Sequence, residues 1–224
     1  MAYFTTSWDD GNSLDLKIAD LLQEYNLKGT FYIPIKYERK TLKDGQIKRI
    51  SKNFEIGSHG FAHKIILLLN AKDAESEVVS SKKILEKIIK KPIISYAYPF
   101  GIFNKRAVTY VRKAGYVFAR TSQEFSIKVG DPLMSKITLR ASNNFSKFLY
   151  PEFFHLMIKS KFKWNNLAKI IFRNCSRHSF FHLMGHSYDL NKENFEEELI
   201  DFFDYVRKSD FRPITNSQIL KVGI

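Results

Sequence analysis

The chain has almost no cysteine and no long apolar run, and both absences limit what it can be. Its single cysteine, Cys175, cannot form a disulfide within the chain, which fits a reducing compartment without proving one. No stretch of about 18 apolar residues is present, so we expect no membrane-spanning segment. Residues 1–5 lack the charged lead and apolar core of a secretory signal. We therefore expect a cytoplasmic protein, with peripheral contact at the inner face of the membrane as an alternative.

Linker sequences are absent as well, because no segment is rich in proline, glycine and serine. A chain of 224 residues is long enough to bury a sizeable core, and 44% of its residues are hydrophobic and 15% aromatic. We predict a single folded domain over residues 1–224.

Positive charge exceeds negative charge by 13 at neutral pH, with 36 lysines and arginines against 23 aspartates and glutamates. This excess permits attraction to nucleic acid, anionic lipid or a phosphorylated substrate. The lysines are spread along the chain among isoleucine, asparagine and phenylalanine, a composition that A/T-rich coding bias also produces. No nucleic-acid-binding motif is present, so we expect no nucleic acid partner.

Short β-rich runs alternate with amphipathic helical patterns. The predicted strands are residues 3–8, 29–35, 54–56, 93–98, 116–120 and 180–185. The predicted helices are residues 14–25, 71–90, 104–114 and 195–206. This alternation favours a mostly parallel sheet covered by helices, as in a barrel or an open α/β fold. Chemistry in barrels gathers at the C-terminal ends of strands, where four polar clusters of this chain lie: Asp9-Asp10, His59/His63, residues 98–101 and His186.

The two acidic and histidine clusters have the composition of a metal site. One carboxylate of Asp9-Asp10 together with His59 and His63 makes a facial ligand set for a divalent ion, and the other carboxylate is left to move protons. Taken alone, Asp-Asp-Gly is also a common β-turn, and two histidines four residues apart are often surface or capping residues. Found together at predicted strand ends, the two motifs favour metal-assisted hydrolysis.

Two further segments have both a structural and a functional interpretation. Residues 98–101 (Tyr-Pro-Phe-Gly) close a strand with an ordinary turn, or form a rigid loop whose backbone N–H groups face a developing oxyanion. His186 is either a satisfied core histidine or a general acid at the end of an apolar strand. His182, four residues earlier, competes with His186 for that role.

These segments together resemble the NodB-type polysaccharide deacetylase family, carbohydrate esterase family 4, in the expected order over nearly the whole chain. The resemblance implies that Asp9 is the catalytic base and that Asp10, His59 and His63 bind the metal. It implies that His186 is the general acid. The segment formed by Tyr98, Pro99, Phe100 and Gly101 would shape a groove wall with a backbone donor near Phe100, and Leu183 and Met184 would line a pocket for the acetyl methyl group.

The same resemblance implies the fold, the cofactor and the substrate class. The fold would be a deformed (β/α) barrel. The cofactor would be a divalent metal, Zn²⁺ first, with Co²⁺, Ni²⁺ or Mn²⁺ as alternatives because availability and geometry decide among them. The substrate would be an N-acetylated saccharide, either free or linked to a lipid, and the oligomeric state stays open.

The chain departs from the family pattern in two places. Many members carry an arginine in the third motif that holds the base, and Ala97 occupies that place here. Arg140 or Arg120 is the candidate replacement from another strand. The fourth motif is not recognisable, and Asp131 is only a candidate for its aspartate. These gaps keep two alternatives open: a hydrolase of other C–N bonds such as cyclic amides, and an inactive glycan-binding module.

Residues 151–178 interrupt the alternating pattern with a basic, aromatic segment. Lysines and arginines alternate there with Trp164, Phe172 and several isoleucines. Such a segment is suited to a membrane interface, where it would serve a lipid-linked substrate. The interpretation that we favour is a helical excursion that packs on the barrel or on a second subunit.

Overall fold

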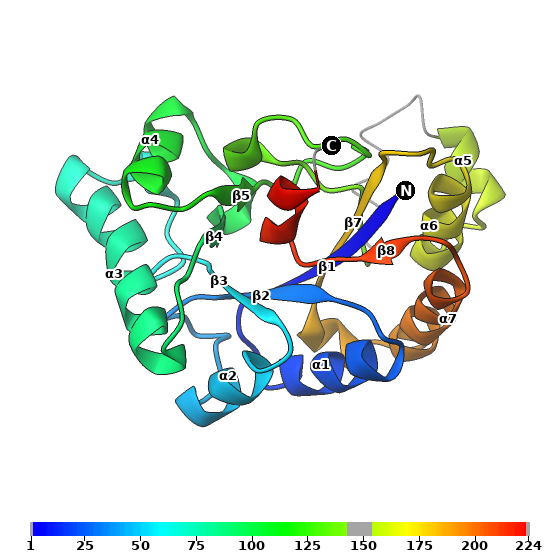
Figure 1. Ribbon diagram of the computed structural model, residues 1–224, viewed down its shortest axis with the longest axis horizontal. Helices are drawn as coiled ribbons and strands as arrows, with labels where there is room; N and C mark the ends of the chain where they lie inside the picture. Colours follow the sequence, from blue (N-terminus) through cyan, green and yellow to red (C-terminus); the bar gives the residue numbers. More distant parts are fainter. Residues whose placement is uncertain (1, 143–153, 223–224) are drawn as a thin grey trace.

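The computed structural model describes residues 2–142 and 154–222 of the chain, arranged around an eight-stranded parallel sheet (Figure 1). The strands are β1 (Tyr3–Asp9), β2 (Gly29–Ile33), β3 (Glu55–Ser58), β4 (Ser95–Ala97), β5 (Phe118–Arg120), β6 (Leu139–Arg140), β7 (Phe180–His186) and β8 (Arg212–Pro213). The helices are α1 (Asp15–Glu24), α2 (Asp44–Ile50), α3 (Ala71–Ile89), α4 (Lys105–Lys113), α5 (Phe154–Lys159), α6 (Trp164–Arg173) and α7 (Phe195–Arg207). Among the described residues, every helix is too short or too polar to span a bilayer.

The strand order is β5-β4-β3-β2-β1-β7-β6, and β8 pairs with the first residues of β1. The segment between β5 and β6 bridges back to β5, where Ser135 pairs with Arg120. The sheet therefore curls into a half-barrel, with helices along its outer face (Figure 1). The predicted deformed (β/α) barrel is confirmed.

The central strand β1 is buried along its whole length because both of its faces are covered. Its helix-facing side includes Phe4, whose ring lies 5.9 Å from that of Phe181 and 6.1 Å from that of Phe202 on α7. Its barrel-facing side is polar: Thr5 donates to Asn216 Oδ1 at 2.9 Å. The alternation of β1 thus separates an aromatic layer under the helices from a polar barrel interior.

The C-terminal segment closes the barrel at the N-terminal ends of the strands. An apolar cluster joins the first residues of β1, β5 and β7 to the 3-10 helix Ser217–Lys221: Tyr3, Phe118, Phe180, Ile214 and Ile219. Asn216 also donates through Nδ2 to the Tyr32 hydroxyl at 2.9 Å and through its backbone N–H to Thr30 at 3.0 Å. This end of the barrel is therefore filled, which leaves the opposite end for a site.

The boundaries of the predicted elements shift for local reasons. Strand β2 stops at Ile33 because Pro34 follows it and cannot donate to a ladder. Helix α3 stops at Ile89 because Lys90 takes a left-handed conformation (φ 58°) and caps it. Helix α2 and the two-residue strands β6 and β8 are additional to the predicted elements.

The described part of the 151–178 segment forms α5 and α6. The apolar face of α6 is buried, with Trp164 1% exposed and Phe172 stacked on Phe211 at 3.7 Å between ring centroids. This arrangement supports the interpretation as a helical excursion that packs on the barrel. Two apolar side chains stay exposed, Ile158 (55%) and Phe162 (37%), and any membrane contact would depend on them. Residues 151–153 lie outside the described residues.

Candidate active site

A cavity of about 280 Å³ lies at the C-terminal ends of the strands. The residues that line it come from the ends of β1, β5, β6 and β7 and from the loops after β2, β3, β4, β5 and β7: Asp9, Asp10, Tyr37, Arg39, His59, His63, Tyr98, Phe100, Gly101, Arg120, Ser122, Arg140, Met184, His186 and Tyr188. Parallel strands end at one edge, so residues far apart in sequence meet there. The clusters that the sequence placed at strand ends therefore lie in one cavity.

Asp10, His59 and His63 come together with the geometry of a metal-ligand set. One ligand atom from each lies within 4.8 Å of the others, and all three side chains are buried. His63 Nε2 lies 3.1 Å from His59 Nε2 and 3.4 Å from Asp10 Oδ1, and His59 Nε2 lies 3.8 Å from that oxygen. Ligands about 2.0–2.2 Å from a tetrahedral zinc ion are roughly 3.4 Å from one another. The donor set therefore fits a divalent ion.

The two imidazoles are held in the form that binds metals. His59 Nδ1 lies 2.9 Å from the carbonyl oxygen of Ala97, which favours a proton on Nδ1 and leaves the Nε2 lone pair facing the cluster. Burial lowers the pKa of His59 to about 4 and that of His63 to about 3. Both rings are therefore neutral at pH 7, as metal ligands must be.

Asp10 has the features of a metal-binding carboxylate. Its Oδ1 is buried and has no hydrogen-bond partner among the described residues. Burial and the neighbouring charge of Asp9 raise its pKa to about 7. A divalent ion held by Asp10 and the histidines would give Asp10 Oδ1 a partner and would favour the ionised carboxylate.

Asp9 has the opposite environment because Arg120 pairs with it. The Arg120 guanidinium donates to Asp9 Oδ1, and its carbon lies 5.0 Å from the centre of the Tyr32 ring. Burial alone would raise the pKa of Asp9, but the charges of Arg120, His59 and His186 outweigh it and hold this pKa well below its usual range. Of the two candidate arginines, Arg120 makes this contact. Arg140 lines the cavity next to β7.

His186 lies at the end of β7 with its ring in the cavity. Its Nε2 is 4.0 Å from Asp10 Oδ2, and its ring stacks on Tyr188 with centroids 5.0 Å apart. Burial lowers its pKa to about 4, while the negative charges of Asp9 and Asp189 favour its protonated form. His182 is fully buried and bonded to Ser7 Oγ at 2.8 Å inside the barrel, so it does not line the cavity.

The third-motif segment forms a strained turn at the mouth of the cavity. Tyr98 is fixed by a 3.0 Å hydrogen bond from its hydroxyl to the carbonyl of Leu133, and buried Pro99 begins a 3-10 turn. Phe100 takes a left-handed conformation (φ 59°), which is uncommon for a residue other than glycine. Its ring is 58% exposed and meets His63 edge-on at 4.6 Å. Gly101 lines the cavity with a φ of 71°.

Two positions differ from the sequence prediction. Met184 lines the cavity, whereas Leu183 lies on the other side of β7 because successive side chains alternate, and it joins the helix-facing core instead. The prediction of a pocket role for Leu183 is therefore not supported. Asp131 caps the 3-10 helix Pro132–Met134 by accepting from Leu133 N at 2.8 Å, and it is not among the cavity residues.

Four cavity residues were not singled out by the motifs: Tyr37, Arg39, Ser122 and Tyr188. Tyr37 stacks on His63 with ring centroids 4.2 Å apart, and Arg39 donates to the Tyr188 hydroxyl at 2.9 Å. The signal that would have found all four is their position after β2, β5 and β7, on loops at the edge that carries the other clusters.

Comparisons with known proteins agree with this geometry. The chain is 26% identical over 113 residues to the peptidoglycan-N-acetylglucosamine deacetylase of Bacillus cereus, an alignment that covers 49% of this chain and 52% of that protein. The chain thus matches about half the length of that curated relative.

Two solved structures share the fold at low identity. The Xyl-CE4 domain of a multidomain xylanase, from the hindgut metagenome of Trinervitermes trinervoides, has a TM-score of 0.69 at 12% identity over 99% of this chain and 91% of that one. The peptidoglycan deacetylase PdaC from Bacillus subtilis has a TM-score of 0.62 at 15% identity over 99% and 91%. The profile described as polysaccharide deacetylase matches residues 3–119, more than half of this sequence. The chain therefore belongs to the polysaccharide deacetylase family.

Proposed function

We propose that this protein is a metal-dependent hydrolase that removes the N-acetyl group from an N-acetylated saccharide. The observation that carries the proposal is the meeting of Asp10, His59 and His63 in one cavity with a second carboxylate, Asp9, held ionised beside them. Family membership supports the reaction class. The saccharide itself is part of the proposal, because the chain matches only about half of its curated relative.

Asp10, His59 and His63 would hold the ion. When bound, a divalent metal supplies a Lewis acid for the acetyl carbonyl and lowers the pKa of a bound water from 15.7 toward about 7. Asp9 would take the proton from the attacking water. The Arg120 guanidinium keeps Asp9 in its basic form and fixes its orientation, because the pair is almost fully buried.

His186 would protonate the leaving amine. It lines the same cavity as Phe100, whose backbone N–H is the candidate donor to the oxyanion. Because burial keeps the imidazole neutral, it must take up a proton before it can act, and the nearby charges of Asp9 and Asp189 favour this step. A general acid or base of this kind contributes about 10²–10⁴-fold to the rate.

The test is acetate release from N-acetylchitooligosaccharides by zinc-loaded protein, with bound metal measured by elemental mass spectrometry. We expect about one divalent ion per chain and acetate production that Asp9→Asn reduces by about 10²-fold or more. Metal bound without any acetate from N-acetylated sugars would reject the deacetylase. It would favour a hydrolase of other C–N bonds or a glycan-binding module instead. A protein that takes up no zinc would reject the metal-dependent mechanism as a whole.

A further inference from the structure

The cavity carries more positive than negative side chains. Among the described residues, its charged lining consists of Arg39, Arg120 and Arg140 against Asp9 and Asp10, with no lysine. A bound divalent ion would add two more positive charges. The site is therefore cationic in the form that would meet a substrate.

Both carboxylates of the cavity are already engaged. Asp9 pairs with Arg120, and Asp10 faces His59 and His63 at the site suited to a metal ion. Arg39 forms no ion pair within 4.0 Å with Asp9, with Asp10 or with any other carboxylate of residues 2–142 and 154–222. Arg39 attracts Asp10 across the cavity without an ion-pair contact, so most of its N–H donors are left for solvent or for a ligand.

Arg39 is nevertheless held in place at the cavity rim. Its Nη1 donates to the Tyr188 hydroxyl at 2.9 Å, and its guanidinium carbon lies 5.1 Å from the centre of the Tyr188 ring. The two residues come from the loops after β2 and β7, the strands on either side of β1. Arg39 uses one N–H group for the bond to Tyr188, and its other N–H groups can still donate to a planar or tetrahedral anion.

A second guanidinium faces the reacting centre from the β6 side. Arg140 ends β6 and Arg39 follows β2, and both line the cavity. Because β2 and β6 lie on different sides of β1 in the sheet, the cavity has an arginine on each side of the reacting centre. The cavity, at about 280 Å³, lies at the small end of ligand pockets, which usually span about 300–1,000 Å³. That volume suits a single sugar residue with a compact substituent.

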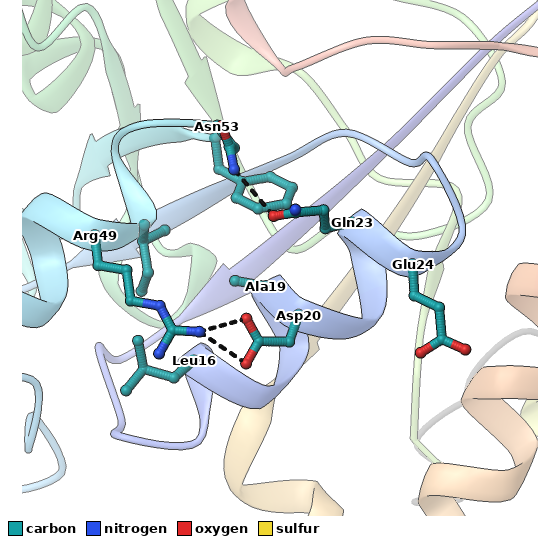
Figure 2. A pocket seen from close by; sticks show the side chains of 9 residues that line it. Leu16, Ala19, Asp20, Gln23, Glu24, Arg49 and Asn53 are labelled. Carbon is teal, nitrogen blue, oxygen red and sulfur yellow. Dashed lines mark hydrogen bonds and ion pairs between the residues drawn. The ribbon is translucent and has the colours of Figure 1, made fainter.

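A larger surface pocket, between α1 and α2, contains an arginine that is paired with a carboxylate of the same chain. Figure 2 shows Arg49 of α2 directed at the Asp20 carboxylate of α1, with oxygens at 2.7 and 3.0 Å. Asn53 and Gln23 are bonded to each other in the same pocket at 3.0 Å. The arginine of that pocket is thus neutralised by a carboxylate of the same chain, unlike Arg39.

We propose that the N-acetylated sugar deacetylated here carries a phosphate group, and that Arg39 binds this phosphate at the cavity rim. The inference rests on the proposed function, because it names the substrate class of the same site. Arginine is suited to phosphate because its fixed fork of N–H donors matches the phosphate oxygens. Tyr37, stacked on His63 beside Arg39, supplies an aromatic wall for the sugar ring.

The experiment compares N-acetylglucosamine 1-phosphate with N-acetylglucosamine as substrates of the zinc-loaded protein. We expect kcat/KM to favour the phosphorylated sugar, and we expect Arg39→Gln to reduce that preference by about 10- to 100-fold, the usual contribution of a charge-assisted hydrogen bond. Arg49→Gln is the matched control, since it removes an exposed arginine that is paired within the chain, and it should leave the preference unchanged. A wild-type protein without the preference, or an Arg39→Gln protein that retains it, would overturn the proposal.

A merely structural role for Arg39 has a different signature. If Arg39 acts only by holding Tyr188, then Tyr188→Phe and Arg39→Gln would lower kcat/KM for both sugars by equal factors, and the preference would persist. Bound zinc, measured in every variant, shows whether the metal site survives the substitution.

Binding of glucose 1-phosphate separates the inference from the proposed function, because this sugar has no acetyl group to remove. Calorimetry should give a dissociation constant about 10-fold or more weaker in Arg39→Gln. Binding that depends on Arg39 without any acetate release would retain the phosphate site and reject the deacetylase. Acetate release with binding independent of Arg39 would do the reverse.

Discussion

Replacing Arg120 by methionine tests the central electrostatic argument. The substitution keeps a long side chain next to Tyr32 but removes the only positive group bonded to Asp9 among the described residues. Because Asp9 and Arg120 are 2% and 1% exposed, the orphaned carboxylate cannot turn to water. Removing one partner of a buried ion pair costs about 3–5 kcal/mol. For a chain of this size that corresponds to a melting temperature lower by roughly 6–20 °C.

The pH dependence of this loss has a defined sign. In the wild type the pKa of Asp9 lies below its ordinary value of 3.8, so the ion pair stabilises the fold above pH 4 and this contribution is lost as the pH falls through the lowered pKa. In Arg120→Met, burial raises the pKa of Asp9, so the variant loses stability as the pH rises above about 4. The difference in melting temperature should therefore be small in acid and widen toward pH 7.

The assay is thermal unfolding of metal-free protein between pH 4 and 7, together with acetate release at pH 7 after zinc loading. We expect turnover to fall by about 10²-fold or more, because a protonated Asp9 cannot act as a base. Arg112→Met, an exposed change on α4, is the control for the loss of one charge. A melting difference that does not change with pH, combined with wild-type turnover, would refute the role given to the pair.

Three further outcomes follow from the site. Asp10→Ala should lose the bound zinc while Asp9→Asn retains it, as measured by elemental mass spectrometry; the opposite result would exchange the two roles. Gly101→Ala should destabilise the protein by about 1–3 kcal/mol in denaturant unfolding, because the added Cβ would lie 2.7 Å from a backbone nitrogen at a φ of 71°. The double variant Ala97→Arg/Arg120→Ala should turn over about 10-fold faster than Arg120→Ala alone. Equal rates would show that an arginine at position 97 of β4 cannot pair with Asp9.

The sheet and the candidate metal ligands were predictable because their signals are local. Short apolar runs of about four to eight residues alternate with segments whose apolar residues recur every 3.6 positions. This pattern predicts parallel strands covered by helices. Asp10, His59 and His63 needed only one further step, the rule that parallel strands end at one edge. Asp10 lies in a turn with a left-handed φ of 75°, so the β-turn interpretation of Asp-Asp-Gly was also correct. The alternative of surface histidines was wrong, because His59 and His63 are buried.

The elements that escaped prediction depend on distant contacts. Strand β8 has only two residues, and it forms by pairing with the backbone of Tyr3 and Phe4 in β1. Asparagine is usually a surface residue, yet Asn216 is fully buried, and β1 and β2 both form hydrogen bonds with it. No periodicity within its own segment indicates this.

The absent third-motif arginine shows how a role can move while its geometry stays. Ala97 on β4 occupies the place where the family pattern has arginine, and in the sheet Ala97 is the register partner of Arg120 on β5. Register partners in parallel strands lie about 4.8 Å apart and point to the same face, so a guanidinium on either strand can reach the same carboxylate. Arg120 reaches Asp9 across 111 positions of sequence. A sequence motif shows only that the arginine is absent at residue 97, whereas the sheet keeps a guanidinium, that of Arg120, on the neighbouring strand.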